Sequence, residues 1–217
     1  MTLGGGDLSE KTNWEAYYAN RKNKPAHIAQ ITRKISAMII LGLLKKHGQN
    51  FKQIYEFGGG DSCFYESFRK KYSNAHYVAL DSAKNGVLRF NQKFGSEKSR
   101  AILCDSLIED FSANADCCFS VGLIEHFTPQ NTRKICKKHF DVTKSGGIVL
   151  ITYPTPTPLY RAIRGILEKL NMWEFKDERA LNFDEVNEVC ADFGNLVARR
   201  LNFYIGLTQE ILVYKKY

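Results

Sequence analysis

The fold is decided by one stretch, Ile54-Tyr55-Glu56-Phe57-Gly58-Gly59-Gly60-Asp61-Ser62. Its first half is typical of a short buried strand. The three consecutive glycines indicate a tight turn in which the backbone can approach a ligand without hindrance from Cβ atoms. Ligands of doubly wound sheets bind beyond the carboxyl ends of the strands, where the strand order reverses. The stretch therefore predicts an α/β sheet with a ligand site at the turn, and a turn without a ligand is the alternative.

Downstream of this turn, short apolar strands alternate with helices. This alternation favours a mostly parallel sheet that is covered by helices on both faces. We expect strands at residues 75–80, 101–104, 117–121 and 147–153, and helices at residues 63–72, 84–94, 130–140 and 184–193.

The C-terminal end breaks this rhythm with two strand-like runs, residues 196–204 and 210–214, joined by the short segment 205–208. Strands that are this close in sequence pair antiparallel, because a parallel return needs a long crossover. The sequence therefore predicts a Rossmann-like mixed sheet of seven strands whose last strand is antiparallel.

The N-terminal fifty residues form a separate part, predicted as a helical lid and a helix, while residues 51–217 form the core. The first two dozen residues, with Gly4-Gly5-Gly6, have a lid-like composition. Apolar residues recur at helical spacing over residues 26–46, and Gly48 supplies a stop. The apolar run 35–44 has roughly half the length of a membrane-spanning helix, so we expect a buried helix.

Composition favours a cytoplasmic globular protein. Of the 217 residues, 44% are hydrophobic and 25% are charged, and the start of the chain has no secretory-signal pattern. The six cysteines include no C-x-x-C pair, and three of them lie in the predicted core strands, which favours reduced thiols. The net charge of +8 is spread over lysine pairs without a block of five like charges, so it identifies no partner.

Two acids follow the predicted second and third strands. Asp81 lies about twenty residues after the glycine turn, where a carboxylate can bind two ribose hydroxyls. Asp105 ends the next strand, within reach of an adenine ring. A helix cap or loop acid is the alternative for each, but two acids at consecutive strand ends favour a nucleoside site.

Together with the segment Phe119-Ser120-Val121-Gly122-Leu123-Ile124-Glu125-His126-Phe127, these features resemble class I S-adenosylmethionine (SAM)-dependent methyltransferases of the small-molecule type. The resemblance is strong over residues 51–153 and implies an enzyme with SAM as its cofactor. It implies a cofactor site made of Glu56, Gly58, Gly59, Gly60, Asp81, Ser82, Asp105, Ser106, Val121, Gly122 and Tyr17.

The sequence departs from the family at Ser62, where a third glycine is common. A nicotinamide dinucleotide is the rival cofactor, but its fingerprint requires glycine at the position of Cys63. Glu56 ahead of the glycines and the terminal hairpin also favour SAM.

The catalytic candidates are His126 and Tyr18. The sulfonium of SAM already makes its methyl group electrophilic, so the protein chiefly aligns the acceptor. His126 follows the fourth strand, and an imidazole titrates in the range of a general base. Tyr17 and Tyr18 resemble the aromatic N-terminal segment that closes over SAM in relatives. Packing is the alternative role for all three residues.

The family resemblance implies that an insert at about residues 154–183 builds the acceptor site. Arg161 and Arg164 lie one helical turn apart, so both guanidinium groups can face one anion, with Tyr160 beside them. A solvated helix face is the alternative. We therefore expect a small, anionic acceptor, and a faint resemblance points to bacterial surface-polysaccharide modification.

Other functions remain open. A nucleic-acid methyltransferase is favoured only by the charge, since neither the Asn/Asp-Pro-Pro-aromatic motif nor a Pro-Cys nucleophile occurs where such enzymes need it. A non-catalytic SAM-binding subunit is the other alternative. We expect no membrane partner and no metal, because nothing resembles the acidic cluster of magnesium-dependent relatives.

Overall fold

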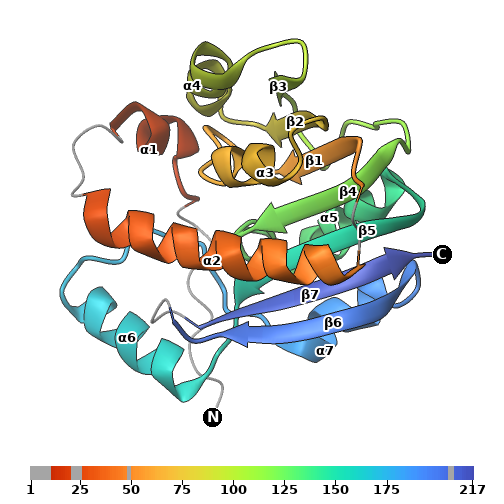
Figure 1. Ribbon diagram of the computed structural model, residues 1–217. Coiled ribbons are helices and arrows are strands. Elements are labelled where there is room, and N and C mark those ends of the chain that lie inside the picture. Colours follow the sequence, from red (N-terminus) through yellow and green to blue (C-terminus); the bar gives the residue numbers. More distant parts are fainter. Residues whose placement is uncertain (1–10, 21–25, 48–49, 205–207) are drawn as a thin grey trace.

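The computed structural model describes residues 11–20, 26–47, 50–204 and 208–217, and of residues 26–30 only the helical backbone (Figure 1). Three features of the sequence lie outside the described residues: the glycine run 4–6, the Gly48 stop and residues 205–207 of the C-terminal hairpin.

The described strands form one seven-stranded sheet in the order β3-β2-β1-β4-β5-β7-β6. β7 pairs antiparallel with β5 and β6, and the other pairs are parallel. This confirms the predicted mixed sheet with an antiparallel last strand. The strands are β1 (Gln53–Phe57), β2 (His76–Asp81), β3 (Ser99–Leu103), β4 (Ala115–Val121), β5 (Thr143–Pro154), β6 (Gly194–Asn202) and β7 (Gln209–Lys216).

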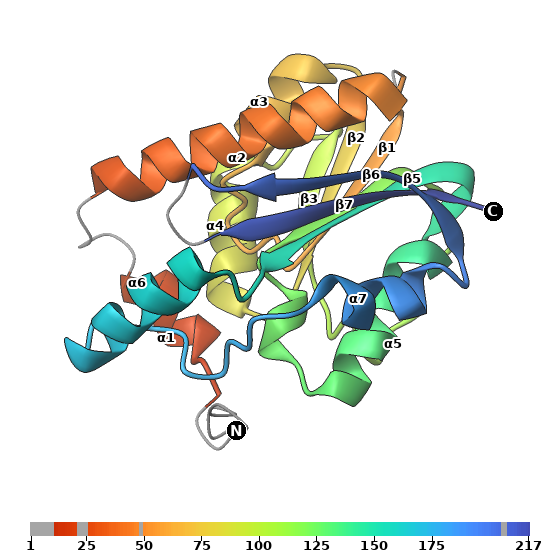
Figure 2. The ribbon, with the colours of Figure 1, turned by 90° about the horizontal axis from the view of Figure 1, so that it is seen from below.

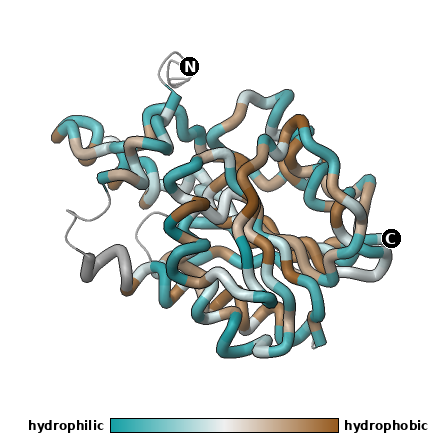
Figure 3. The backbone as a smooth tube through the Cα atoms, turned by 90° about the horizontal axis from the view of Figure 1, so that it is seen from above, coloured by the Kyte–Doolittle hydropathy of each residue, from teal (hydrophilic) through white to brown (hydrophobic). Residues whose placement is uncertain are grey.

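Helices cover both faces of the sheet, as predicted (Figure 2). One face carries α2 (Ala26–His47), α3 (Tyr65–Lys71) and α4 (Lys84–Phe94), and the other carries α5 (Pro129–Asp141) and α7 (Phe183–Cys190). Side chains alternate along a strand, so Ile54 of β1 packs toward α2 while Tyr55 and Phe57 pack toward α5. The apolar strands run through the centre in Figure 3, inside more polar surroundings.

Two further helices lie at the end of the sheet toward which the parallel strands point. They are α1 (Trp14–Asn20) and α6 (Pro158–Lys169), and both views place them there (Figures 1 and 2). α1 packs against α4. This end carries the loops that follow β1, β2, β4 and β5, so it is the end where a ligand site is expected.

α2 contains the apolar run 35–44, and Ile40 and Leu44 are fully buried in the core. No helix among the described residues is long and apolar enough to cross a membrane. Cys117 and Cys118 of β4 are also fully buried, and all six cysteines are unpaired, as expected for reduced thiols.

Several element boundaries differ from prediction by a few residues, and two of these differences have clear local reasons. α3 begins at Tyr65 rather than residue 63, because Ser62 adopts a positive φ of 31° and its hydroxyl accepts the backbone N–H of Tyr65 at 3.0 Å. β5 begins at Thr143, four residues early, and crosses Gly146 at φ 75°. A positive φ suits glycine, so the strand passes this irregularity without strain.

Candidate active site

The glycine turn after β1 is tied to the end of β2. Gly58 and Gly60 adopt φ values of 68° and 49°, which favour glycine. The Gly58 N–H donates to the carbonyl of Leu80 at 2.8 Å, and the Gly60 N–H donates to Oδ2 of Asp81 at 2.7 Å. Oδ1 of Asp81 accepts the N–H of Ala83, also at 2.7 Å. Each carboxylate oxygen has a second lone pair, so Asp81 can still accept hydroxyl groups of a ligand.

Glu56 lies buried beneath the turn. Its Oε2 accepts the hydroxyl of Tyr77 at 2.6 Å, and a Cβ on Gly59 would lie only 2.9 Å from that same oxygen. Burial raises the pKa of Glu56 to about 7, against the lowering effect of hydrogen bonds from Ser62 and Tyr77. Glycine at position 59 is therefore required by close packing, and Glu56 supports the turn from below.

α1 lies directly over this turn. The ring of Tyr18 packs between two glycines: a Cβ on Gly60 would lie 1.9 Å from its hydroxyl oxygen, and one on Gly86 would lie 3.0 Å from its ring. Glu15 accepts the first backbone N–H groups of α4, those of Lys84 at 2.5 Å and Asn85 at 3.0 Å. A carboxylate at a helix N-terminus is electrostatically favourable. The predicted lid helix thus contacts the predicted cofactor site, and the hydroxyl of Tyr18 lies on the cofactor side.

The loop after β4 also borders the glycine turn, and we call this side the cofactor wall. Gly122 adopts φ 67°, and its N–H donates to the carbonyl of Thr152 at 3.1 Å. The side chain of Leu123 lies 2.8 Å from where a Cβ on Gly58 would be. Val121 and Gly122 therefore lie beside the glycine turn, as the resemblance implies.

Two predicted cofactor regions are more exposed. Asp105 is exposed and accepts the N–H of Leu107 at 2.9 Å through Oδ1, while Ser106 lies 3.8 Å from the sulfur of Cys104. Ser82 is exposed beside buried Asp81. Asp105 remains able to accept through its other oxygen, so the geometry permits the predicted contact with an adenine amino group.

His126 lies in the short 3-10 helix η2 (Ile124–His126) and is held by a carboxylate that the sequence did not indicate. Its Nδ1 lies 3.0 Å from Oδ1 of Asp177, and both side chains are largely buried. Burial lowers the pKa of His126, but Asp177 and Glu125 raise it more, for a net rise. Burial raises the pKa of Asp177, but hydrogen bonds from His126 and Thr12 lower it to about 2.

Aromatic rings from α1 and from the loop before α7 surround His126. The ring of Trp14 stands edge-on to the imidazole at 5.0 Å between centroids and stacks on Phe175 at 5.8 Å. Tyr17 packs against both Trp14 and Phe175. Thr12, just before α1, donates to Asp177 through its N–H at 3.0 Å and through its hydroxyl. The lid segment therefore docks on the His126–Asp177 pair.

Two more acids join this group. One carboxylate oxygen each from Glu125 and Glu178 and one ring nitrogen of His126 all lie within 4.8 Å of one another. Burial raises the pKa of Glu125 and of Glu178. The loop is held in place by Arg179, whose N–H donates to the carbonyl of Glu125 at 3.1 Å and whose guanidinium donates to the carbonyl of Phe127 at 2.9 Å.

α6 carries the predicted acceptor residues Tyr160, Arg161 and Arg164, and these side chains differ in burial and in hydrogen bonding. The hydroxyl of buried Tyr160 donates to Oε1 of Glu178 at 2.8 Å. Arg164 donates to this hydroxyl and to the carbonyl of Glu178, both at 2.9 Å, and to Glu168 at 2.7 Å. Arg161 is exposed. Arg164 is therefore engaged within the protein, and the two arginines do not share one open anion site.

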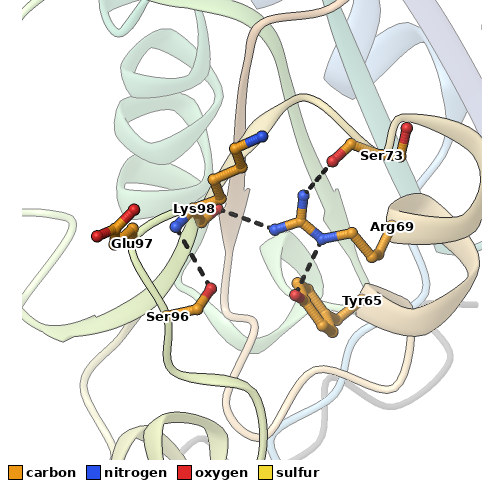
Figure 4. A pocket seen from close by; sticks show the side chains of 6 residues that line it. All are labelled: Tyr65, Arg69, Ser73, Ser96, Glu97 and Lys98. Atoms are coloured by element: carbon orange, nitrogen blue, oxygen red, sulfur yellow. Dashed lines mark hydrogen bonds between the residues drawn. The ribbon is translucent and has the colours of Figure 1, made fainter.

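A shallow pocket around Arg69 lies away from this site (Figure 4). Its guanidinium, on Arg69, donates to the hydroxyl of Tyr65 and to the carbonyls of Ser73 and Lys98. Ser73 and Lys98 come just before β2 and β3, so the pocket lies at the amino end of the parallel strands. Arg69 acts there as a structural clamp.

Comparisons with known proteins agree with this fold. The protein family described as "Methyltransferase domain" matches residues 55–151, from β1 into β5. No curated protein matches the sequence significantly.

Three solved structures illustrate the shared fold. The methyltransferase SibL has a TM-score of 0.69 at 14% identity over 84% of this chain, which spans only 55% of SibL. The N-methyltransferase NodS from Bradyrhizobium japonicum WM9, bound to S-adenosylhomocysteine (SAH), has a TM-score of 0.65 at 10% identity over 96% and 94% of the two chains. The 1,6-didemethyltoxoflavin-N1-methyltransferase from Burkholderia thailandensis, also with SAH, has a TM-score of 0.68 at 14% identity over 94% and 85%.

The family match covers the strands and loops that carry the glycine turn, Asp81 and His126. Residues 55–151, just under half of the chain, thus match a methyltransferase domain, and the shared fold supports an enzyme that uses SAM as its methyl donor.

Proposed function

We propose that this enzyme transfers the methyl group of SAM to an oxygen or nitrogen of a small acceptor bound beneath α1, with His126 as the general base. The observation that carries this proposal is the His126–Asp177 pair. With its Nδ1–H donated to Asp177, the imidazole keeps Nε2 as the acceptor of a proton. Its position after β4 is beside Gly122, at the cofactor wall.

The cofactor would be held by the residues around the glycine turn. In this proposal Glu56 and residues 58–60 shape the pocket for the methionine part, and Asp81 with Ser82 binds the ribose. Asp105 with Ser106 binds the adenine. Val121 and Gly122 form the opposite wall, and Tyr17 and Tyr18 close it from α1. The contacts of Tyr18 with Gly60 and Gly86 support closure of the cofactor site as its role.

The acceptor in this proposal carries an anionic group. Its support is the exposed guanidinium of Arg161 on α6, one residue from Tyr160. Arg164 would act indirectly, by positioning Tyr160 and Glu178. A sugar nucleotide or phospho-compound of surface-polysaccharide synthesis meets this description. Two of the similar structures are named N-methyltransferases, which supports nitrogen as an acceptor atom.

The test is a screen with purified protein, methyl-labelled SAM and a panel of sugar nucleotides and phospho-amines. We expect methylated product, and we expect His126→Ala to lower kcat by about 10²–10⁴-fold with nearly unchanged SAM affinity. A loss below tenfold would return His126 to a packing role. Binding of SAM without turnover of any acceptor would favour a non-catalytic subunit.

The same assay separates the small-molecule proposal from a nucleic-acid acceptor. A small anion presents few charges, so KM should rise only modestly with salt. A steep fall in affinity with salt, together with inhibition by a generic RNA, would overturn the small-molecule proposal.

A further inference from the structure

The group formed by Glu125, His126 and Glu178 gathers more carboxyl groups than its surroundings keep ionised. Burial raises the pKa of Glu125 and of Glu178 although His126 lowers both, so a bound cation would favour their charged forms. Glu125, Glu178 and the adjoining Asp177 bring three carboxylates around one imidazole. The guanidinium of Arg164 reaches the carbonyl of Glu178 and the hydroxyl of Tyr160, and its ion pair is with Glu168. Buried charges are stable only when paired, so this group is suited to a cation.

Glu125 provides a second and independent observation. It is 2% exposed, and its Oε2 is buried without a hydrogen-bond partner among the described residues. A buried polar atom left without a partner costs about 1–3 kcal/mol. Such an atom is expected where a ligand supplies the missing donor.

The position of Glu125 connects this group to the cofactor. A Cβ on Gly122 would lie 3.3 Å from Oε1 of Glu125. Gly122 belongs to the wall beside the glycine turn, so the carboxylate of Glu125 extends from the cofactor side to the His126 side. Glu178 is only partly buried, which leaves an approach for an acceptor from its side.

The surroundings favour an organic ammonium over a metal ion. Charge-assisted N–H···O bonds are about 2.8 Å long, so one nitrogen can bridge oxygens up to about 5.6 Å apart, and the spacing within 4.8 Å meets this condition. Trp14 and Phe175 lie against His126 with ring centroids at 5.0 and 5.7 Å. Aromatic rings are not metal ligands, and an apolar wall of this kind suits the organic part of an ammonium ion.

We propose that the acceptor is an amine, bound as an ammonium ion between the carboxylates of Glu125 and Glu178; this rests on the proposed function. The ammonium first gives one proton to Nε2 of His126, whose charge Asp177 balances. The freed nitrogen lone pair then forms a bond to the methyl carbon while the carbon–sulfur bond breaks. Both electrons of the broken bond stay on sulfur, so the products are SAH and a methylammonium ion.

The test uses a probe that does not depend on the natural acceptor. Protein saturated with SAH is titrated with benzylamine, which is a cation at pH 7, or with neutral benzyl alcohol at equal ionic strength, and its melting temperature is followed. A ligand that binds only the folded state raises this temperature. We expect a rise with benzylamine and little response to benzyl alcohol.

Substitutions at Glu125 and Glu178 test whether benzylamine binds between these two side chains. Glu125→Gln and Glu178→Gln each replace an ionisable carboxyl group by a neutral amide of similar shape, and each should weaken benzylamine binding roughly tenfold or more while SAH affinity is kept. The matched control is Glu97→Gln, an exposed glutamate in the pocket of Figure 4, which should leave binding unchanged. Using both glutamine variants guards against misfolding of either one.

The possible outcomes distinguish failure of this inference from failure of the proposed function. Equal responses to amine and alcohol would overturn the inference, as would an amine effect that both glutamine variants retain. Stabilisation by Mn²⁺ or Zn²⁺ that is lost in both variants and displaces benzylamine would overturn it in favour of a metal site. A methyl group found on oxygen or carbon of the true acceptor would also overturn it, while leaving methyl transfer intact. Failure to bind SAH would instead contradict the proposed function itself.

Discussion

Nδ1 of His126 lies 3.0 Å from Oδ1 of Asp177, although 51 positions separate the two residues in the sequence. The lid segment touches the same carboxylate through Thr12. One buried acid therefore holds both the imidazole and the segment before α1, so the position of α1 and the orientation of the imidazole are linked.

Asp177→Asn should change the pH dependence of catalysis. A base must be deprotonated, so kcat/KM rises with pH through the pKa of His126, which its acidic neighbours hold above the usual value. Removing one acid should move this acidic limb to lower pH. It should also lower kcat by about 10- to 10⁴-fold, because the imidazole loses its orienting partner. Exposed Asp192→Asn is the control, and an unmoved acidic limb would contradict the assigned pair.

Glu56→Gln should flatten the pH dependence of stability in the unliganded protein. The pKa of Glu56 is raised from 4.5 to about 7, so the folded protein keeps a proton that the unfolded chain loses between these values. The stability from this proton is present at low pH and is lost as the pH rises through about 7, by on the order of 3 kcal/mol.

Denaturant melts at pH 5 and pH 8 measure this effect. Relative to the wild type, Glu56→Gln should have a higher free energy of unfolding at pH 8 than at pH 5. The exposed control Glu66→Gln should show no such difference. Equal pH slopes in wild type and Glu56→Gln would show that the buried carboxyl does not carry this proton.

Gly60→Ala should displace Tyr18. The new Cβ would overlap the hydroxyl of Tyr18, and alanine at φ 49° is strained by about 1 kcal/mol. Trp14 belongs to the same helix as Tyr18, so movement of α1 should alter tryptophan fluorescence. Gly165→Ala, at an open position in α6, is the control and should leave the emission unchanged. Unchanged emission in Gly60→Ala would contradict the packing of α1 on the turn.

The two arginines of α6 should respond differently to lysine substitution. Arg164→Lys loses hydrogen bonds to Tyr160, Glu178 and Glu168, and should lower the free energy of unfolding by about 1–2 kcal/mol. Exposed Arg161→Lys should leave stability alone and raise KM for an anionic acceptor. Chemical denaturation and acceptor kinetics separate these effects. Kinetic indifference to Arg161→Lys would remove the anion-binding role proposed for it.

The fold was predictable because its signals are local. Alternating apolar runs define the strands, and the short spacing of the last two forces an antiparallel pair. The meeting of Gly60 and Asp81 was predictable for a similar reason, since both lie at the carboxyl ends of adjacent parallel strands.

The acceptor side could not be read in the same way. Asp177 and Glu178 lie in the loop 173–179, which has no periodicity, and they reach His126 only through the packing of Arg179 and the lid segment. The aromatic and charged character of this loop was visible in the sequence, but its partners were not. The pairing of Arg161 with Arg164 was expected from helical spacing alone, and this spacing does not reveal that Arg164 binds Tyr160.

Calorimetric titration with SAH tests the central claim most directly, because it needs no acceptor. We predict binding at one site per chain and roughly 10- to 100-fold weaker binding by Asp81→Asn, whose side chain can no longer accept hydrogen bonds at both of its ends. Exposed Asp192→Asn should bind as the wild type does. Absence of SAH binding by the wild-type protein, or full affinity in Asp81→Asn, would contradict the cofactor site described for this enzyme.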